Sequence, residues 1–310
     1  MRKVKFGVML RQEKVDFGSI RDGAVLCDEL GYDSVWFYDH LIGVSSPELD
    51  IFESWTLMSA LSTITSKIRI GTLVLCNSFR HPALLAKTAS TLDNISGGRL
   101  DVAVGAGWYE EEYKSYGYEF PDTAMRIEQL KEAVKIIKAL WTEERATFEG
   151  KHYQIKNALC NPKPVQKPHP PLIIGGSGEK LLLRVVAEVA DGWNCPASSA
   201  DVYDRKLGVL KKHCRNVGRD INEIKISEQT VAVVAKDKRE LAEKLPKAVK
   251  RFGFFGNIEK TGIVGMPDEC INRIRKKVDR GVTQFMIFFS DGINPETLRL
   301  FAKEIIPAFS

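Results

Sequence analysis

The fold is decided most clearly by residues 68–105, IRIGTLVLCNSFRHPALLAKTASTLDNISGGRLDVAVG. Ile68–Leu75 is a short apolar run of the kind found in buried strands. Pro82 suits a first helical turn, and apolar residues then continue at helical spacing until two glycines end the helix. A second apolar run, Leu100–Val104, follows at once. This order predicts two parallel strands joined by a crossover helix.

The same alternation continues on both sides of this stretch. The clearest helix pattern has its apolar residues at Ile127, Leu130, Val134, Ile137 and Leu140. The further strand patterns are Val4–Leu10, Ser34–Phe37, Leu172–Ile174, Gly192–Asn194, Glu223–Val234 and Gln284–Phe289. Eight strands alternating with helices predict an α/β protein with a single (β/α)8 TIM barrel over residues 1–310. A doubly wound open sheet fits less well, because no G-x-G-x-x-G follows the first strand.

Two segments interrupt the alternation. Residues 145–171 are expected to be a short insertion, in which Ala146–Ile155 has the pattern of a hairpin. The proline-rich stretch Pro162–Pro171 then predicts a stiff surface connection. Residues 251–264 contain glycines and no clear period, which predicts an irregular, mobile loop.

Composition and charge exclude several classes of protein. Of the 310 residues, 44% are hydrophobic and 27% are charged, which is ordinary for a globular protein. The net charge of +5 comes without a clustered basic stripe, which argues against a nucleic-acid partner. No run of 18 apolar residues predicts a membrane helix. The six cysteines lack a C-x-x-C pair and the five histidines lack helical pairing, so we expect no metal site and a reducing, cytoplasmic environment.

Polar residues gather where the predicted strands end, which is where a parallel barrel carries its reactive groups. Asp39 and His40 directly follow the second strand. They are either a pair that reaches a bound ligand or a cap beside a packing residue. Arg80 follows the third strand and is either an anion contact or a structural pin.

Glycine-rich turns follow two later strands. Gly105-Ala106-Gly107 either allows the close approach of a ligand or makes a plain tight turn. The turn Gly175–Gly178 leads into a helix expected to begin near Glu179, and such a turn presents several N–H groups to one point, as phosphate sites do. The chain has no G-x-S-x-G, P-loop or H-E-x-x-H motif. Glycine-rich loops without a protein nucleophile favour an enzyme whose cofactor carries the chemistry.

Five motifs, in this order along the chain, resemble those of the luciferase-like monooxygenase superfamily. They are Gly71–Cys76 with Arg80–Lys87, Leu92–Leu100, Val104–Trp108, Pro162–Gly178 and Ala190–Asn194. The resemblance covers roughly residues 4–305 and is greatest for the branch that uses the deazaflavin coenzyme F420 instead of FMN. It implies a barrel enzyme with a small-molecule substrate and no membrane partner, and we expect a homodimer.

The resemblance also implies where the cofactor is bound. Asp39 and His40 match the family's pair at the deazaflavin ring. Leu73–Cys76 match a strand bulge that contains a non-prolyl cis peptide bond in this family, and we place that bond at Leu73–Val74. The full set of implied contacts is Asp39, His40, Leu73, Val74, Cys76, Gly107, Trp108, Tyr113, Gly175, Gly176, Ser177 and Gly178.

The implied reaction is hydride transfer between coenzyme F420 and an organic substrate. His40 is the expected proton donor, with Glu13 and Glu110 as reserves. The family's glucose-6-phosphate dehydrogenase has a Glu directly after its G-x-G, where this chain has Trp108. The resemblance therefore leaves the substrate open. The alternatives are an FMN-dependent monooxygenase on the same barrel and a non-catalytic protein that binds flavin or F420.

Overall fold

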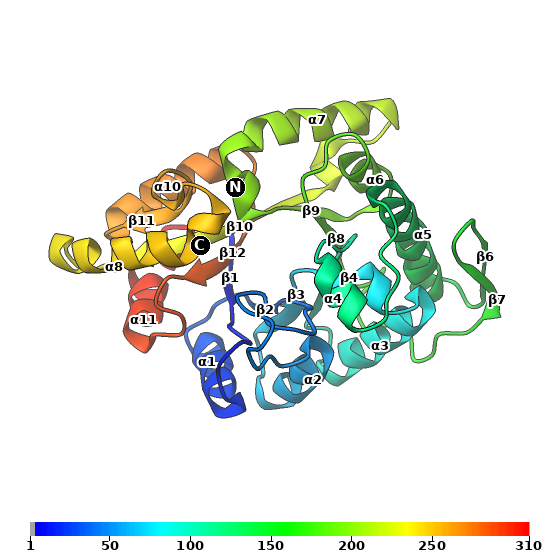
Figure 1. Ribbon diagram of the computed structural model, residues 1–310, viewed down its shortest axis with the longest axis horizontal. Coiled ribbons are helices and arrows are strands. Elements are labelled where there is room, and N and C mark those ends of the chain that lie inside the picture. The colour runs from blue at the N-terminus through cyan, green and yellow to red at the C-terminus, as the bar shows by residue number, and fades with distance from the viewer. Residues whose placement is uncertain (1–3, 310) are drawn as a thin grey trace.

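Eight parallel strands close into a barrel in the computed structural model, which describes residues 4–309 (Figure 1). In order around the barrel they are β1 (Lys5–Met9), β2 (Ser34–Phe37), β3 (Arg69–Thr72), β5 (Leu100–Gly105), β8 (Leu172–Gly175), β9 (Gly192–Cys195), β10 (Lys225–Val234) and β12 (Gln284–Phe289). The first and last strands pair with Lys5 opposite Gln284, which closes the barrel. The predicted single-domain (β/α)8 fold is therefore confirmed.

Helices surround the barrel in Figure 1. They are α1 (Phe17–Glu29), α2 (Ser54–Ile64), α3 (Pro82–Ile95), α4 (Glu110–Ser115), α5 (Thr123–Thr142), α6 (Leu182–Val189), α7 (Tyr203–Asn216), α8 (Lys238–Phe252), α9 (Ile258–Thr261), α10 (Pro267–Asp279) and α11 (Pro295–Glu304). Local signals explain several starts: Asp16 accepts from the N–H of Ser19 at α1, and Pro82 opens α3. Within residues 4–309, none of these helices has both the length and the apolar character needed to cross a membrane.

Apolar side chains pack on both sides of the barrel strands. Alternate strand residues, such as Phe6 and Val8, contribute to the large core between strands and helices. The residues between them face the barrel interior, where they form a second cluster of Met9, Trp36, Leu73, Ala103, Ile173 and Met286. Because side chains fill the interior, a ligand of this barrel must bind at one of its ends.

The third predicted strand, Ile68–Leu75, is split in the structure. β3 ends at Thr72, a cis peptide bond joins Leu73 to Val74 as predicted, and β4 (Leu75–Cys76) then pairs with β5. The Val74 side chain fits between two neighbouring strands. A Cβ added at Gly105 would lie 2.7 Å from one of its methyl groups, and a Cβ added at Gly175 would lie 2.6 Å from the other. Both glycines therefore make room for Val74.

The expected hairpin is present as β6 (Ala146–Glu149) and β7 (Gln154–Ala158), an antiparallel pair separate from the barrel. The proline-rich connection that follows is fixed against α3. Asn94 Nδ2 donates to the carbonyl oxygen of Lys163 at 2.9 Å, and the hydroxyl of Ser90 donates to that of Pro162. These bonds explain why the connection follows the protein surface.

The prediction of an irregular loop at residues 251–264 is wrong. The segment contains the end of α8, a 3-10 turn at Gly253–Phe255, helix α9 and the start of β11 (Ile263–Gly265), which pairs with β10. Phe252 and Ile258 belong to a buried cluster, and Phe255 packs against it. This apolar packing orders a segment whose glycines and lack of period suggested otherwise. Its mobility stays a prediction.

One helix start also differs from expectation. α6 begins at Leu182 rather than near Glu179. The side chain of Glu179 forms ion pairs with Arg205 and Lys206, at 3.0 and 2.8 Å, and its carbonyl oxygen accepts from His213. These contacts with α7 hold Glu179 in the turn before the helix.

Candidate active site

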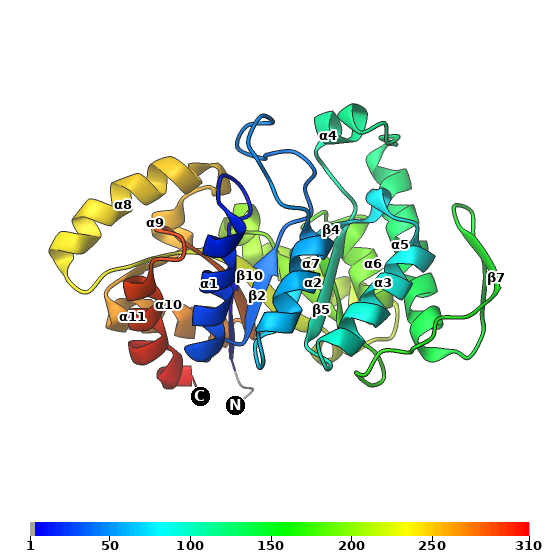
Figure 2. The same cartoon turned by 90° about the horizontal axis from the view of Figure 1, so that it is seen from below.

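The candidate site residues lie at the carboxyl ends of the barrel strands. Asp39 and His40 follow β2, Cys76 ends β4, Gly107 follows β5 and Ser177 follows β8. Because the barrel strands are parallel, these positions share one end of the barrel. Figure 2 shows α4 and the segment between β2 and α2 projecting from this end, while the chain termini lie at the opposite end.

His40 is held by a buried carboxylate. Its Nδ1 lies 3.0 Å from Oε2 of Glu112 in α4, and Glu112 is almost completely buried. The same carboxylate accepts hydrogen bonds from the backbone N–H groups of Leu41 and Ile42. A carboxylate at Nδ1 fixes the orientation of an imidazole and leaves Nε2 for proton transfer. His40 and Glu112 therefore form a dyad in which Glu112 positions the ring.

Aromatic rings surround this imidazole. Trp108 and Tyr109 lie edge-on to His40, with ring centroids 5.7 and 6.2 Å away. The two aromatic rings stack on each other at 5.1 Å, and Trp108 is 65% exposed. Tyr38 lies 6.0 Å from the imidazole. These rings offer apolar surface next to the dyad, on which a planar ligand can pack.

The carboxylate of Asp39 is buried and fully occupied by the protein. Arg80 binds it through two nitrogens, at 2.6 and 3.0 Å, and also pairs with Glu53 at 2.8 Å. The hydroxyl of Ser54 and the backbone N–H of Cys76 each donate to it at 2.9 Å. Of the two roles considered for Arg80, an anion contact and a structural one, these contacts support the structural role. Asp39 ties the end of β2 to β4, and so positions the cis-peptide segment.

Glu13, one reserve proton donor, anchors a loop. Its carboxylate accepts hydrogen bonds from the backbone N–H of Val44 and from the hydroxyl of Ser45, the latter at 2.9 Å. An isolated bridge between Glu13 and Ile51 ties the far end of the same loop to the chain after β1. The carboxylate therefore holds residues 41–51 in place at the barrel rim.

Glu110, the other reserve donor, points away from His40. Its side chain is 54% exposed and pairs with Lys114 at 2.8 Å. Successive residues of an α-helix are rotated by about 100°, so Glu110 and Glu112 face roughly opposite sides of α4. The carboxylate of this run that reaches the site is Glu112, which was not singled out from the sequence. No local pattern in the run Glu110–Glu112 marks it, because the buried face of α4 is set by how this short helix packs in the fold.

Cys76 and Tyr113 form a buried pair next to β4. The thiol sulfur lies 2.9 Å from the tyrosine hydroxyl. Burial raises the pKa of the Cys76 thiol to about 11, although the bond to Tyr113 acts against this, and burial also raises the pKa of Tyr113. Both groups therefore stay neutral near neutral pH. Tyr113 packs with Phe79 in a small cluster, so it supports the site from within the protein.

The two glycine-rich turns present backbone N–H groups that lack a protein acceptor. Within the described residues 4–309, the N–H groups of Gly107 and Trp108 make no hydrogen bond, and neither do those of Ser177 and Gly178. The turns follow β5 and β8, which are neighbours in the barrel. Adjacent N–H groups without acceptors are typical of sites that bind an oxyanion such as phosphate.

Gly107 is expected to tolerate no side chain. Its φ is +79°, and an added Cβ would lie 1.8 Å from the Tyr113 hydroxyl oxygen and 3.0 Å from the Cys76 sulfur. Gly117 has a similar φ of +74° but open space around it. We expect Gly107→Ala to lower the free energy of unfolding by about 1–3 kcal/mol more than Gly117→Ala does, because the overpacking cost applies only to the first. Urea denaturation measures both.

A double variant tests the assigned clash. Gly107→Ala combined with Tyr113→Phe removes the nearest oxygen, so it should recover part of the stability lost in Gly107→Ala. Equal destabilisation by Gly107→Ala and Gly117→Ala would show that backbone conformation alone explains the glycine at position 107.

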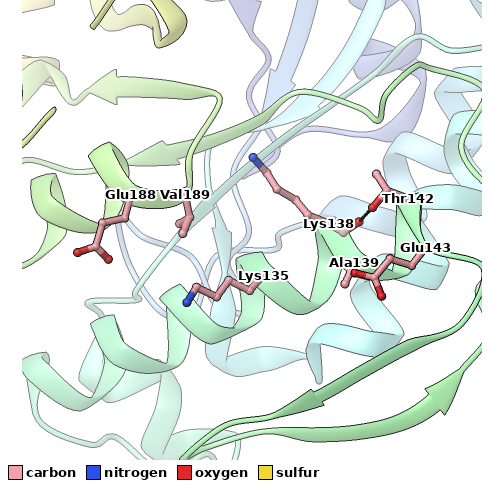
Figure 3. Close-up of a pocket in the computed structure, with 7 residues that line it drawn as sticks. All are labelled: Lys135, Lys138, Ala139, Thr142, Glu143, Glu188 and Val189. Atoms are coloured by element: carbon pink, nitrogen blue, oxygen red, sulfur yellow. Dashed lines mark hydrogen bonds between the residues drawn. The ribbon is translucent and has the colours of Figure 1, made fainter. Parts of the chain in front are cut away.

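Two cavities of the described residues lie away from this end. One, of about 380 Å³, is on the outer surface between α5 and α6, and Figure 3 shows Lys135, Lys138 and Glu188 around it. The other, of about 510 Å³, is lined by Lys5, Lys225 and Gln284 among others, which begin their strands at the opposite end of the barrel. Neither contains a candidate residue, so the site is assigned from the strand ends.

Comparison with known proteins identifies the family. The chain matches the luciferase-like monooxygenase family over residues 3–260. An F420-dependent glucose-6-phosphate dehydrogenase of Microbacterium testaceum (strain StLB037) is 31% identical, with 98% of this chain and 97% of that protein covered. Two solved structures share the fold: an F420-dependent secondary alcohol dehydrogenase (TM-score 0.83, 23% identity, 99% of both chains) and a monooxygenase from Streptomyces bottropensis (0.82, 24%, 99% and 100%). This chain belongs to the luciferase-like monooxygenase family.

Proposed function

We propose that this protein is an oxidoreductase that transfers a hydride between coenzyme F420 and an organic substrate. The observation that carries the proposal is the His40–Glu112 dyad, which holds an imidazole at the barrel end where two turns offer N–H groups to an oxyanion. The 31% identity to an F420-dependent dehydrogenase along nearly the whole chain supports this choice of coenzyme.

The residues at this end of the barrel fit the coenzyme. F420 joins a planar deazaflavin ring to a side chain that contains phosphate, and the N–H groups of Gly107, Ser177 and Gly178 would hold that phosphate. Val74 and His40 would contact the ring. When bound, the deazaflavin supplies a ring carbon that gives or takes a hydride and reacts poorly with oxygen.

His40 would move the proton that accompanies the hydride. Its Nδ1 faces Glu112, so Nε2 is the nitrogen left to exchange a proton with a substrate oxygen. The buried carboxylate of Glu112 stabilises the imidazole when it carries the proton, and holds the ring in one orientation. Trp108 and Tyr109 cover one side of the imidazole and limit its access to water.

Binding of the two related coenzymes tests the proposal directly. We expect F420 to bind more tightly than FMN, because the sequence resemblance and the F420-dependent relative reported above both point to the deazaflavin branch. Titration with each coenzyme, followed by the intrinsic tryptophan fluorescence to which Trp108 next to His40 contributes, measures both affinities. Gly178→Val should fold normally, because its added Cβ meets only Leu182, at an ordinary distance of 3.5 Å. It should weaken F420 binding, because the valine side chain would crowd the N–H groups of the turn.

A matched control is Gly208→Ala in α7, where an added Cβ meets nothing within 4 Å. This variant should bind F420 as the unaltered protein does. Micromolar binding of FMN without detectable F420 binding would show that FMN is the cofactor and would favour a monooxygenase. That enzyme would also carry a yellow flavin that is reoxidised by air, which the absorption spectrum of the purified protein reveals.

We also propose a homodimer in the cytoplasm. Leu84 and Ile95 are more than half exposed and lie eleven residues apart on α3, so they share one outward face of that helix. All six cysteines are free and buried, which suits a reducing compartment. Sedimentation velocity determines the oligomeric state, and a monomer at micromolar concentration would contradict this part of the proposal.

A further inference from the structure

Two arginines, Arg11 and Arg251, meet at the same end of the barrel. Arg11 lies two residues after Met9, whose side chain faces the barrel interior, so strand alternation directs Arg11 inward at the rim. β1 pairs with β12 up to Val8, opposite Ile287, so Arg11 and Ser290 both lie just beyond the ends of these two neighbouring strands. Arg251, in the last turn of α8, donates from Nη1 to the carbonyl oxygen of Ser290 at 3.1 Å. Both arginines therefore lie at the barrel rim where β1 and β12 end.

Neither guanidinium group has a carboxylate partner. Within residues 4–309, Arg11 and Arg251 form no ion pair. Two carboxylates in the vicinity have partners of their own: Glu13 holds the loop described above, and Asp291 pairs through Oδ2 with Lys244 at 2.9 Å, while its Oδ1 is buried without a hydrogen-bond partner. Burial and the nearby charge of Arg11 both lower the pKa of Arg251. Two like charges that lie together without a direct ion-pair partner are the arrangement expected where an anionic ligand binds.

The arginines lie across the barrel end from the glycine-rich turns. Around the barrel, β12 is four strands away from β5, and β1 is four strands away from β8. β2, which carries His40 at its end, is next to β1. A molecule that exchanges a proton with His40 is therefore close to the arginines, whereas the turns that offer N–H groups are on the far side.

We propose that Arg11 and Arg251 form an anion subsite that binds a carboxylate or phosphate group of the substrate. This inference rests on the proposed function, because the glycine-rich turns are assigned to the coenzyme. Guanidinium groups suit this task, since each presents several N–H donors in a plane that matches the oxygens of either anion. The substrate class is then an organic molecule with one anionic group, placed so that its reacting carbon lies near His40.

Titration of the F420-saturated protein with inorganic phosphate tests the subsite, and calorimetry measures the dissociation constant. We expect Arg11→Gln and Arg251→Gln each to weaken phosphate binding by about ten- to a hundred-fold, because each removes a charge-assisted hydrogen bond. Arg11→Lys should retain part of the affinity. The matched control is Arg239→Gln on α8, whose side chain is 90% exposed and pairs only with Glu243. It should bind phosphate as the unaltered protein does.

The affinity for F420, measured for every variant, distinguishes failure of the anion subsite from failure of the proposed function. Unchanged F420 affinity with weakened phosphate binding supports the subsite and shows that the variants are folded. Weakened F420 affinity would mean that the arginines bind the anionic tail of the coenzyme, which overturns the assignment to substrate. Phosphate binding that is absent at millimolar concentration, or unaffected by Arg11→Gln, also overturns it. If F420 fails to bind but phosphate binding still depends on Arg11, the proposed function is wrong and the anion subsite stands.

Discussion

Replacement of His40 by alanine is expected to lower turnover by about 10²–10⁴-fold, the usual contribution of a general acid–base group. The affinity for F420 should change little, because the N–H groups of the turns at Gly107 and Ser177 remain in place. The physical reason is that the two reserve donors are engaged elsewhere: Glu13 holds a loop, and Glu110 is 54% exposed and pairs with Lys114. The measurement is the absorbance change of F420 with any substrate that supports turnover.

Two further variants define the role of the dyad. Glu112→Gln keeps the side-chain shape but removes the charge that positions the imidazole, so it should lower the turnover number more than it changes the Michaelis constant. His81→Ala removes another histidine, which caps α3 through the N–H of Ala83, and should leave turnover unchanged. If His40→Ala retains nearly full turnover, the imidazole only packs against the ligand and the proton comes from elsewhere.

Replacement of Asp39 by alanine should destabilise the fold by about 3–5 kcal/mol, the usual cost of removing one partner from a buried ion pair. Arg80 would keep only Glu53 as an ionic partner. The hydroxyl of Ser54 and the N–H of Cys76 would also lose their acceptor inside the protein. Because Asp39 joins β2 to β4, the loss should affect the whole barrel end. Urea denaturation measures the free energy of unfolding.

Two comparisons isolate the buried charge. Asp22→Ala removes an exposed carboxylate that pairs with Arg21, and should cost no more than about 1 kcal/mol. Asp39→Ala combined with Arg80→Met removes both charges, so it should be less destabilised than Asp39→Ala alone. A loss for Asp39→Ala no larger than that for Asp22→Ala would contradict the role given to this network.

The barrel itself was predictable because its signals are local. Apolar runs such as Leu100–Val104 and the helical period through Ile137 depend on residues near in sequence, and the structure places β5 and α5 over them. The cis bond at Leu73–Val74 was predicted from the family resemblance, since no local pattern distinguishes it from a continuous strand. The split of that strand follows from how Val74 packs, which the sequence alone does not reveal.

The roles of individual side chains were harder to predict because they depend on contacts between distant segments. His40 meets Glu112 across 72 positions of sequence, and nothing in the run Glu110–Glu112 shows which carboxylate turns inward until α4 is placed. The resemblance implies that Asp39 contacts the cofactor, and the structure adds that Arg80 binds its carboxylate, which no local sequence pattern reveals. The segment 251–264 was misjudged for the same reason, since its order comes from packing on the barrel.

The pairing of Lys5 with Gln284 has a consequence for how the chain is made. β1 leaves the ribosome long before β12 is made. The edge of β1 that pairs with β12 is therefore unpaired during almost the entire synthesis. During that time the backbone groups of β1 and β10 that later bond to β12 have no partner and can template pairing with other nascent chains. Closure of the ring by β12 removes both edges in one event, which makes the last strand the one that protects newly made protein from aggregation.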